Sequence, residues 1–273
     1  MAKKSLNLEA LLTPTQPANG VSKDAPQGRL PKILTIDIET SPNISYTWGL
    51  WQQNVSLSQL IQSSRVLCFA AKWHDEKKTT FYSEHELGHQ GMIEAAWNLL
   101  NDADIVVSYN GPAFDIKHLQ REFVQAGMTP PSPFKNVDLL RTARSQFKFP
   151  SNKLDYVGQV LGLGEKVKHA GFELWIKVMA GDDKAWQEMK KYNVQDVKLT
   201  EVLFDYLGPW IKGMPHIGLW TGQRCCSKCG GQDLRHDGFV HSGASVYARL
   251  QCQSCGAWNR ATTREGKTEI KPL

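Results

Sequence analysis

The sequence has 273 residues, a formal net charge of +5 and an isoelectric point near 8.8. A chain of this length can bury a substantial core, and its mildly basic charge is compatible with a polyanionic ligand without establishing one. It contains no run of 18 apolar residues, and the opening MAKKSLNLEALLTPTQ lacks the apolar segment and cleavage site of a secretory signal. We therefore expect a soluble, cytoplasmic protein without a membrane-spanning segment.

The start of the chain differs in composition from the rest. Residues 1–29 are rich in Pro, Gly, Ser and Lys and show no sustained hydrophobic period, so we expect a flexible arm with one short helix at residues 6–12. The main domain then covers residues 30–210. Its first part carries runs of β-branched and aromatic residues that predict an antiparallel meander. The expected strands are residues 33–39, 44–51, 66–74 and 79–83.

Helices and strands alternate in the next part of this domain, and the alternation makes the predicted sheet mixed. Most of the chain from there to residue 206 is predicted to be helical, apart from interruptions at residues 129–134 and 162–171. The elements expected before this helical region are a helix at residues 92–101, a strand at 105–109, a helix at 114–126 that ends at Gly127, and a strand at 136–140.

Three segments carry acidic residues in a pattern typical of a metal site. Asp37 and Glu39 lie in the predicted strand ILTIDIET, and because successive side chains of a strand face opposite sides, these two project together. The segment YNGPAFD ends at Asp115, where a helix is expected to begin. In YNVQD, Tyr192 and Asp196 are four residues apart on a predicted helix and therefore share one face.

Clustered carboxylates repel one another and raise one another's pKa unless cations compensate. Magnesium and manganese ions prefer carboxylate oxygens and water as ligands. Two such ions would flank a phosphodiester, one lowering the pKa of the attacking water and the other stabilising the departing oxygen. Tyr192 would orient that water. The predicted ligands of the two Mg²⁺ or Mn²⁺ ions are Asp37, Glu39, Asp115 and Asp196.

The segments TIDIET, NGPAFD and Tyr192-x-x-x-Asp196 resemble the three motifs of the ribonuclease-H-like 3′-to-5′ exonucleases, in the branch whose third motif carries tyrosine. That branch includes the proofreading domains of family A and family B DNA polymerases and stand-alone bacteriophage exonucleases. The phage type is also similar in DIETSPN, WGLW, SNKLDYVGQVLGLG and FELW, so the resemblance covers residues 30–210. It implies an α/β fold with a mixed five-stranded sheet flanked by helices, catalytic carboxylates at strand ends and on the last helix, and stepwise release of nucleoside 5′-monophosphates.

Each motif taken alone has a plainer explanation. A D-x-E pair on a strand is a weak signal, because short motifs often match by chance. Asp115 could be the N-terminal cap of the adjoining helix, and Tyr192 and Asp196 could be exposed positions on a charged helix. The three motifs nevertheless occur in the right order on a strand, a strand-to-helix junction and a late helix, and this combination favours catalysis.

Other residues near the motifs allow two interpretations. The dipeptide Asn110-Gly111 could permit a close backbone approach or could simply form a turn. Trp48 and Trp51 could stack on substrate bases, although aromatic residues on a strand more often enter the core. Basic residues in the later loop could contact phosphates, although the solvated interpretation is the usual one. They are Lys153, Lys166, Lys168 and His169.

Near the C-terminus, two C-x-x-C pairs are each followed by glycine and are separated by 22 residues. Four thiolates at this spacing predict a tetrahedral zinc site in a zinc ribbon, with the glycines permitting tight turns. A disulfide framework is the alternative, and it is disfavoured because the cytosol keeps thiols reduced. Cys225 could replace Cys226 as a ligand. The predicted ligands are Cys226, Cys229, Cys252 and Cys255.

The ribbon is expected at residues 222–262, between a linker at residues 211–221 and a tail at residues 263–273. Residues 222–273 hold eight Lys and Arg against four Asp and Glu, which is the basic footprint typical of nucleic-acid modules. A zinc ribbon can also bind only protein or serve only structure, so DNA contact is the favoured interpretation among three.

These features predict a metal-dependent 3′-to-5′ exonuclease with two Mg²⁺ or Mn²⁺ ions and one structural Zn²⁺. The resemblance implies DNA with single-stranded 3′ ends as substrate, and a role in phage DNA replication, repair or proofreading in the host cytoplasm, alone or beside a separately encoded DNA polymerase or replication protein. One alternative is an RNA-trimming 3′-to-5′ exoribonuclease of the same fold, because contact with the 2′-hydroxyl cannot be read from motifs. Another is a non-catalytic nucleic-acid-binding adaptor in which the ribbon carries the function, which the complete acidic set disfavours.

Overall fold

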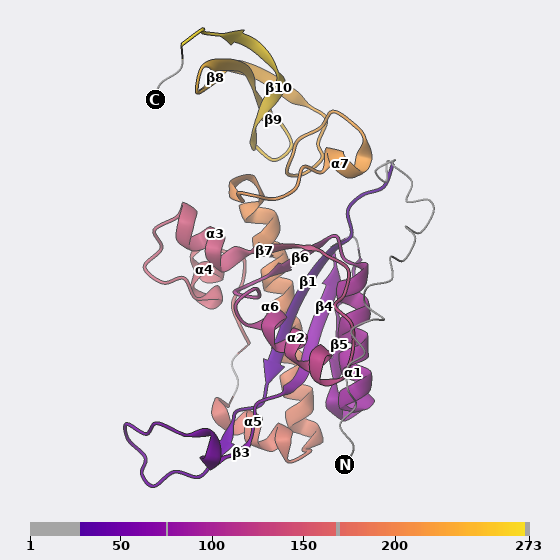
Figure 1. Ribbon diagram of the computed structural model, residues 1–273, viewed down its shortest axis with the longest axis vertical. Coiled ribbons are helices and arrows are strands. Elements are labelled where there is room, and N and C mark those ends of the chain that lie inside the picture. The colour runs from indigo at the N-terminus through magenta and orange to yellow at the C-terminus, as the bar shows by residue number, and fades with distance from the viewer. Residues whose placement is uncertain (1–27, 75, 168–169, 271–273) are drawn as a thin grey trace, which may run out of the picture.

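The computed structural model describes residues 28–74, 76–167 and 170–270. The short helix expected at residues 6–12 lies outside these residues. Over the described part, the chain forms a large unit of helices around a five-stranded sheet and a smaller unit with a three-stranded sheet (Figure 1). No helix in the described part combines the length and apolar character that crossing a membrane requires.

The large sheet is mixed, as the sequence predicts. Its strand order is β5-β4-β1-β6-β7. β1 pairs antiparallel with β4 and parallel with β6, so the two kinds of pairing meet at the central strand. β4 pairs antiparallel with β5, and β6 pairs parallel with β7. The strands are β1 (Ile33–Thr40), β4 (Val66–Trp73), β5 (Thr80–Ser83), β6 (Ile105–Ser108) and β7 (Lys135–Asp138).

Helices flank both faces of this sheet, which confirms the predicted fold class. They are α1 (Glu84–Asp102), α2 (Asp115–Gln125), α3 (Leu139–Gln146), α4 (Leu154–Val160), α5 (Phe172–Met179) and α6 (Asp183–Leu207). The side chains of Leu34, Ile36 and Ile38 on β1 pack with α1 and α2 in one hydrophobic core. Ile33 packs with α6 in a second core on the other face. Because strand side chains alternate, Asp37 and Glu39 share the face of Ile33 and point toward α6.

The strand expected at residues 44–51 is wrong in extent and in position. Only β2 (Ile44–Ser45) forms there, and it pairs with β3 (Leu60–Gln62) in a separate two-stranded hairpin that also holds the 3₁₀ helix η2 (Leu57–Gln59). The side chains of Trp48 and Trp51 are 99% and 85% exposed, so they are not part of the core. Strand propensity is realised where a side chain packs on a half-buried surface, and this segment projects away from the sheet (Figure 1).

Two further boundaries differ from the sequence prediction because capping residues set them. α1 begins at Glu84 rather than residue 92, since the Ser83 hydroxyl accepts a hydrogen bond from the Glu86 amide at 3.1 Å. Gly88, with φ of 71°, interrupts the helical geometry inside α1. β7 ends at Asp138 rather than residue 140, since the Asp138 carboxylate accepts from the Leu140 amide at 2.9 Å and caps α3.

The small C-terminal unit follows α6 through the 3₁₀ helix η3 (Gly208–Trp210) and α7 (Gly218–Thr221). Its sheet has the order β10-β9-β8, with both pairs antiparallel. The strands are β8 (Leu234–Ser242), β9 (Ser245–Cys252) and β10 (Trp258–Lys267), so the last strand continues past residue 262. Figure 1 shows this sheet beyond the C-terminal end of α6, whereas the β2–β3 hairpin lies at the opposite end of the molecule.

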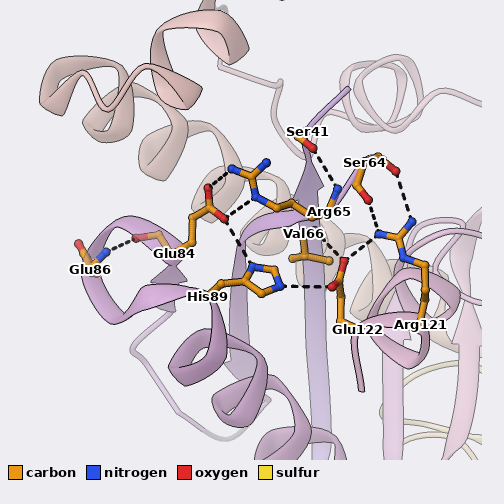
Figure 2. Close-up of polar contacts among 10 residues, drawn as sticks. Ser41, Ser64, Arg65, Val66, Glu84, Glu86, His89, Arg121 and Glu122 are labelled. Atoms are coloured by element: carbon orange, nitrogen blue, oxygen red, sulfur yellow. Dashed lines mark hydrogen bonds and ion pairs between the residues drawn. The ribbon is translucent and has the colours of Figure 1, made fainter. Parts of the chain in front are cut away.

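Hydrogen bonds to a buried carboxylate link α2 to the start of β4. Glu122 of α2 is buried and accepts hydrogen bonds from the Val66 amide at 3.1 Å and from Arg121 at 2.8 Å, while His89 of α1 lies 3.2 Å away (Figure 2). Burial alone would raise the pKa of Glu122, but the bonds from Arg121, Val66 and His89 hold that pKa below its usual value.

The same network reaches the end of β1. Arg65 makes a two-bond ion pair with Glu84 of α1, at 2.9 and 2.7 Å. The Arg65 amide also donates to the hydroxyl of Ser41, the residue directly after β1, at 3.0 Å (Figure 2). α1, α2 and the start of β4 are therefore bound to the end of the strand that carries Asp37 and Glu39.

Replacing Glu122 by glutamine should lower the free energy of unfolding by about 1.5 to 3 kcal/mol, because charge-assisted hydrogen bonds to a buried group are lost. Since the folded-state pKa of Glu122 is depressed, its contribution should be present near neutral pH and should disappear in acid as the carboxylate is protonated. Urea unfolding at several pH values measures both effects. The matched control is Glu86→Gln, whose exposed pairing with Lys190 should contribute less than about 1 kcal/mol. Equal losses for the two variants would contradict the anchoring role.

Candidate functional site

The site begins on the central strand, where Asp37 and Glu39 face α6. The side-chain amide of Asn193 on α6 donates to Asp37 Oδ2 at 2.7 Å and to the Asp37 carbonyl at 3.1 Å. Asn193 is fully buried, so these bonds fix the position of α6 against β1. Asn193 is not among the residues that the sequence motifs predict. Its place beside Tyr192 was the only available signal, and adjacency on a helix does not show which strand a side chain meets.

Asp115 joins the site from α2. It is the first residue of that helix, Phe114 occupies the cap position, and no side-chain cap bond is made there. Asp115 Oδ1 instead accepts from the Ile38 amide at 2.9 Å, on the backbone between Asp37 and Glu39. Asp115 therefore contacts the central strand, and the capping explanation does not hold.

Both interpretations of Asn110-Gly111 apply to the turn before Asp115. Asn110 has a φ of 74°, and the Phe114 amide donates to its carbonyl at 3.1 Å, which closes the turn. A Cβ atom on Gly111 would lie 2.0 Å from the hydroxyl of Ser108 and 3.5 Å from Asp115 Oδ2. Glycine is therefore required for the close approach that brings Asp115 to β1.

Asp196 and Tyr192 lie on α6 and share a contact with Lys166. The Lys166 ammonium donates to Asp196 Oδ2 and, at 3.3 Å, to the Tyr192 hydroxyl. It also lies 5.1 Å from the centre of the Tyr192 ring, and its backbone amide is held by Asp155 at 2.8 Å. The solvated interpretation of Lys166 is therefore wrong. Lys168 and His169 lie outside the described residues.

Burial raises the pKa of all four acids, and repulsion by neighbouring carboxylates raises those of Asp37 and Glu39 further. Burial, followed by the charges of Asp115, Glu39 and Asp196, raises the pKa of Asp37 well above its usual value. Burial and Asp196 raise the pKa of Glu39 to about 8, and burial raises the pKa of Asp115 to about 6. The pKa of Asp196 is raised by burial despite the bond from Lys166. Such a cluster has the electrostatic character of a cation site.

The carboxylate oxygens that remain available as ligands fit a magnesium or manganese ion. Asp196 Oδ1 is buried and has no hydrogen-bond partner among the described residues, so one ligand oxygen is available while Oδ2 contacts Lys166. In the part of the chain that the structure describes, no three carboxylates bring oxygens within 4.8 Å of one another. The free Asp196 oxygen fits a hard ion such as magnesium or manganese, whose shell water and phosphate would complete.

Two cavities flank the acidic cluster. One, of about 520 Å³, is lined by Asp37 together with the cationic residues Arg144, Lys153 and Lys166. The other, of about 320 Å³, is mostly apolar and lies between the segment directly after Glu39 and the start of α5. Trp175, in the second cavity, makes an edge contact with Tyr192 at 6.3 Å between ring centres. The residues of the second cavity are Thr40, Ser41, Pro42, Gly171, Phe172 and Trp175.

Comparison with protein-family models matches residues 34–208 to the RNase H superfamily. The chain belongs to the RNase H superfamily. The matched residues include Asp37, Glu39, Asp115, Tyr192 and Asp196, and membership of this superfamily supports a nuclease activity.

Solved structures give the same fold. A family B DNA polymerase from the hyperthermophilic archaeon Pyrobaculum calidifontis is similar at a TM-score of 0.52 and 17% identity, over 79% of this chain and 32% of the polymerase chain. This member of the RNase H superfamily thus spans about a third of that polymerase, and the likeness concerns the fold. A search of the curated proteins finds no match.

A cysteine cluster lies outside the RNase H match. The sulfurs of Cys226, Cys229, Cys252 and Cys255 all lie within 4.8 Å of one another. The Cys226–Cys255 and Cys229–Cys252 distances are 3.7 and 3.6 Å. Zinc–sulfur bonds of about 2.3 Å in a tetrahedron require sulfurs about 3.8 Å apart, so the cluster fits one zinc ion. Cys225 is buried outside this cluster.

The turns around the cysteines are also those of a zinc site. Gly230 and Gly256 have φ of 75° and 77°, as expected for the glycine after each pair. Their amides donate to the carbonyls of Cys226 and Cys252 at 3.1 and 2.9 Å. The Lys228 amide lies 3.4 Å from the Cys226 sulfur, a contact that helps to stabilise a thiolate.

The purified chain should carry one zinc ion, and Cys226→Ser or Cys252→Ser should lose it, because each removes one of four thiolates. Zinc binding contributes about 10 to 16 kcal/mol to the folding of small zinc modules, so these variants should also expose the C-terminal unit to proteolysis. Metal analysis and limited proteolysis measure the two effects. Cys225→Ser is the control and should retain zinc. Zinc loss from Cys225→Ser with retention in Cys226→Ser would reverse the ligand assignment.

Manganese should raise the melting temperature more at pH 8 than at pH 6, because protons on Glu39 and Asp115, with pKa near 8 and 6, compete with the ion. Without added manganese, the melting temperature should be lower at pH 8 than at pH 6. Carboxylates with raised folded-state pKa stabilise the fold while protonated, so stability should fall as the pH rises through this window. Differential scanning fluorimetry on zinc-loaded protein tests both expectations. Asp37→Asn, which removes one predicted ligand, should reduce the increase in melting temperature that manganese causes. An equal increase at pH 6 and pH 8 in the unsubstituted protein would contradict the competition between protons and the ion.

Proposed function

We propose that this protein is a divalent-metal-dependent 3′-to-5′ exonuclease that hydrolyses DNA to nucleoside 5′-monophosphates. The observation that carries the proposal is the acidic cluster at β1, α2 and α6, in which partial removal from solvent and the neighbouring carboxylates raise the pKa of Asp37 and Glu39. Such a cluster is unfavourable unless cations compensate it. Membership of the RNase H superfamily supports the nuclease class.

In this proposal, the ligands of two Mg²⁺ or Mn²⁺ ions are Asp37, Glu39, Asp115 and Asp196. When bound, the ions supply a lowered pKa for an attacking water and charge stabilisation for the departing oxygen. Asn193 keeps Asp37 on the side of α6, and the Ile38 amide keeps Asp115 against β1. These bonds hold the carboxylates in place before substrate arrives, so less ordering remains to be done during the reaction.

Tyr192 orients the attacking water in the proposed reaction. Burial and the charges of Glu39 and Asp196 raise its pKa, so the phenol remains protonated at neutral pH. A protonated phenol both donates and accepts hydrogen bonds, which is what positioning a water requires. Lys166 restrains the phenol from one side and Trp175 contacts the ring from another.

The two cavities beside the acidic cluster support cleavage from the end of a DNA strand in this proposal. The apolar cavity beside Thr40 and Trp175 suits a terminal nucleoside, because bases stack on aromatic rings. The cavity lined by Arg144, Lys153 and Lys166 suits the phosphate backbone leading into the site. The fold shared with a DNA polymerase supports DNA as the substrate. Such an activity would serve DNA replication, repair or proofreading, alone or beside a separately encoded polymerase.

Activity should require added magnesium or manganese, and Asp37→Ala and Asp115→Ala should abolish it, because each removes a proposed ligand. Tyr192→Phe should be milder, with a loss of about tenfold to a thousandfold, since only a hydrogen bond to the water is removed. Single-stranded DNA labelled at the 5′ end in one series and at the 3′ end in another distinguishes stepwise shortening from internal cutting and gives the direction.

The control for lost charge is Asp183→Asn, an exposed acid at the start of α6 that should leave the rate unchanged. Circular dichroism establishes that each variant is folded. Undiminished cleavage by folded Asp37→Ala or Asp115→Ala would overturn the site. Faster shortening of a matched RNA strand would favour the exoribonuclease, and absence of cleavage with every metal would favour the adaptor.

A further inference from the structure

One face of the C-terminal sheet carries alternating arginine and aromatic side chains. In the β9–β10 pairing, Arg260 lies directly opposite Arg249. On the same face, Trp258 lies opposite Gln251, and Arg264 lies opposite Tyr247. β8 extends the face, because Arg235 pairs with Gln251 and donates to its side chain at 3.2 Å. We call this surface the arginine–aromatic face; it consists of Arg235, Tyr247, Arg249, Trp258, Arg260 and Arg264.

The charged and aromatic groups of this face contact one another. The Arg249 guanidinium lies 4.7 Å from the centre of the Trp258 ring, and the Arg260 guanidinium lies 4.2 Å from the centre of the Tyr247 ring. Trp258 is 49% exposed, so part of its ring remains accessible to solvent beside Arg249.

The electrostatics of this face are unbalanced. Like charges directly opposite each other destabilise a strand pair, and Arg249 and Arg260 occupy such positions. Asp237 offers partial compensation, at 3.7 Å from Arg249 and 3.8 Å from Arg235. Among the described residues, no carboxylate forms an ion pair with Arg260 or Arg264. An anionic ligand would remove this imbalance.

The cysteine cluster is adjacent to the strands that carry the arginine–aromatic face. Cys252 ends β9, and Cys255 lies in the turn that leads to Trp258 at the start of β10, so two of the four cysteines belong to this connection. A zinc ion at the cluster would therefore hold the register of Arg249, Trp258 and Arg260. The proposed catalytic carboxylates belong to the larger unit, with Asp37 and Glu39 on β1, Asp115 on α2 and Asp196 on α6, so substitutions on this face should leave their contacts intact.

We propose that the arginine–aromatic face binds single-stranded nucleic acid, with phosphates on the arginines and bases stacked on Trp258 and Tyr247. Rings that accept bases next to cations that accept phosphates are the two components of sequence-tolerant single-strand binding. A duplex keeps its bases stacked inside, so it would use the arginines alone. The proposal concerns binding and is independent of whether the acidic cluster cleaves DNA.

Fluorescence anisotropy of a labelled oligothymidylate with the full-length, zinc-loaded protein, without added magnesium, tests this surface. Arg249→Gln/Arg260→Gln should lower the slope of log affinity against log salt by about 1.4, since each lost phosphate contact on a single strand removes about 0.7. Trp258→Ala should weaken binding about 5-fold to 150-fold and leave the salt slope unchanged, because stacking releases no counterions. A duplex probe should respond to the arginine variant and not to Trp258→Ala.

The matched control is Lys77→Gln/Lys78→Gln, which removes the same charge from the exposed turn between β4 and β5. It should change the slope less than the arginine variant. Metal analysis of each variant establishes that zinc is retained. Because Arg249 also donates to the Asp237 carbonyl at 2.8 Å, the single variant Arg260→Gln provides a second test without that bond. Wild-type affinity and slope in Arg260→Gln and Trp258→Ala, or an equal slope change in the lysine control, would overturn the proposal.

Discussion

Repulsion among four carboxylates, of which Asp115 and Asp196 are buried and Asp37 and Glu39 half-buried, is the constraint on which the organisation of the larger unit depends. Asp37 and Glu39 come from the central strand, Asp115 from the start of α2, and Asp196 from α6. Their burial raises the cost of ionisation, so the fold must hold them together by other means. The Asn193 amide and the Ile38 backbone amide provide direct bonds to Asp37 and Asp115, and the two hydrophobic cores on either side of β1 hold the helices that carry the rest.

The alternation of one strand creates both the core and the site. Leu34, Ile36 and Ile38 bury one face of β1 against α1 and α2, while Asp37 and Glu39 occupy the other face beneath α6. A slip of one residue in the pairing of β1 would exchange the two sets, placing the apolar residues beneath α6 and burying the acids in the core against α1 and α2. The acids and the hydrophobic residues are thus fixed in register together, and the network around Glu122 and Arg65 holds the chain directly after β1 through Ser41.

Local patterns in the sequence predict those features of the fold and the site that residues close together in the chain determine. The projection of Asp37 with Glu39, the mixed sheet and the spacing of the cysteine pairs all follow from short-range rules. Lys166 and Asn193 could not be assigned, because their contacts join segments up to 156 residues apart and no local periodicity encodes such a distance. Trp48 shows that a local propensity can also predict a strand that the fold does not form. Its β propensity is real, but whether a surface exists for it to pack on is decided by the whole fold. The catalytic roles of the carboxylates stay predictions.

The two units carry opposite electrostatic imbalances. The larger one gathers carboxylates that favour cations, and the smaller one places Arg249 opposite Arg260, with Asp237 as the acid that pairs with Arg249 in the described part of the chain. A protein that only needed stability would gain from removing either arrangement, because like charges at close range oppose folding in both. A nucleic-acid strand bound as proposed relieves both at once, since its phosphates neutralise the arginines directly and share divalent cations with the carboxylates. The chain's modest net charge of +5 conceals this division, which is why overall composition indicates so little about the partner while the separate faces indicate a polyanion.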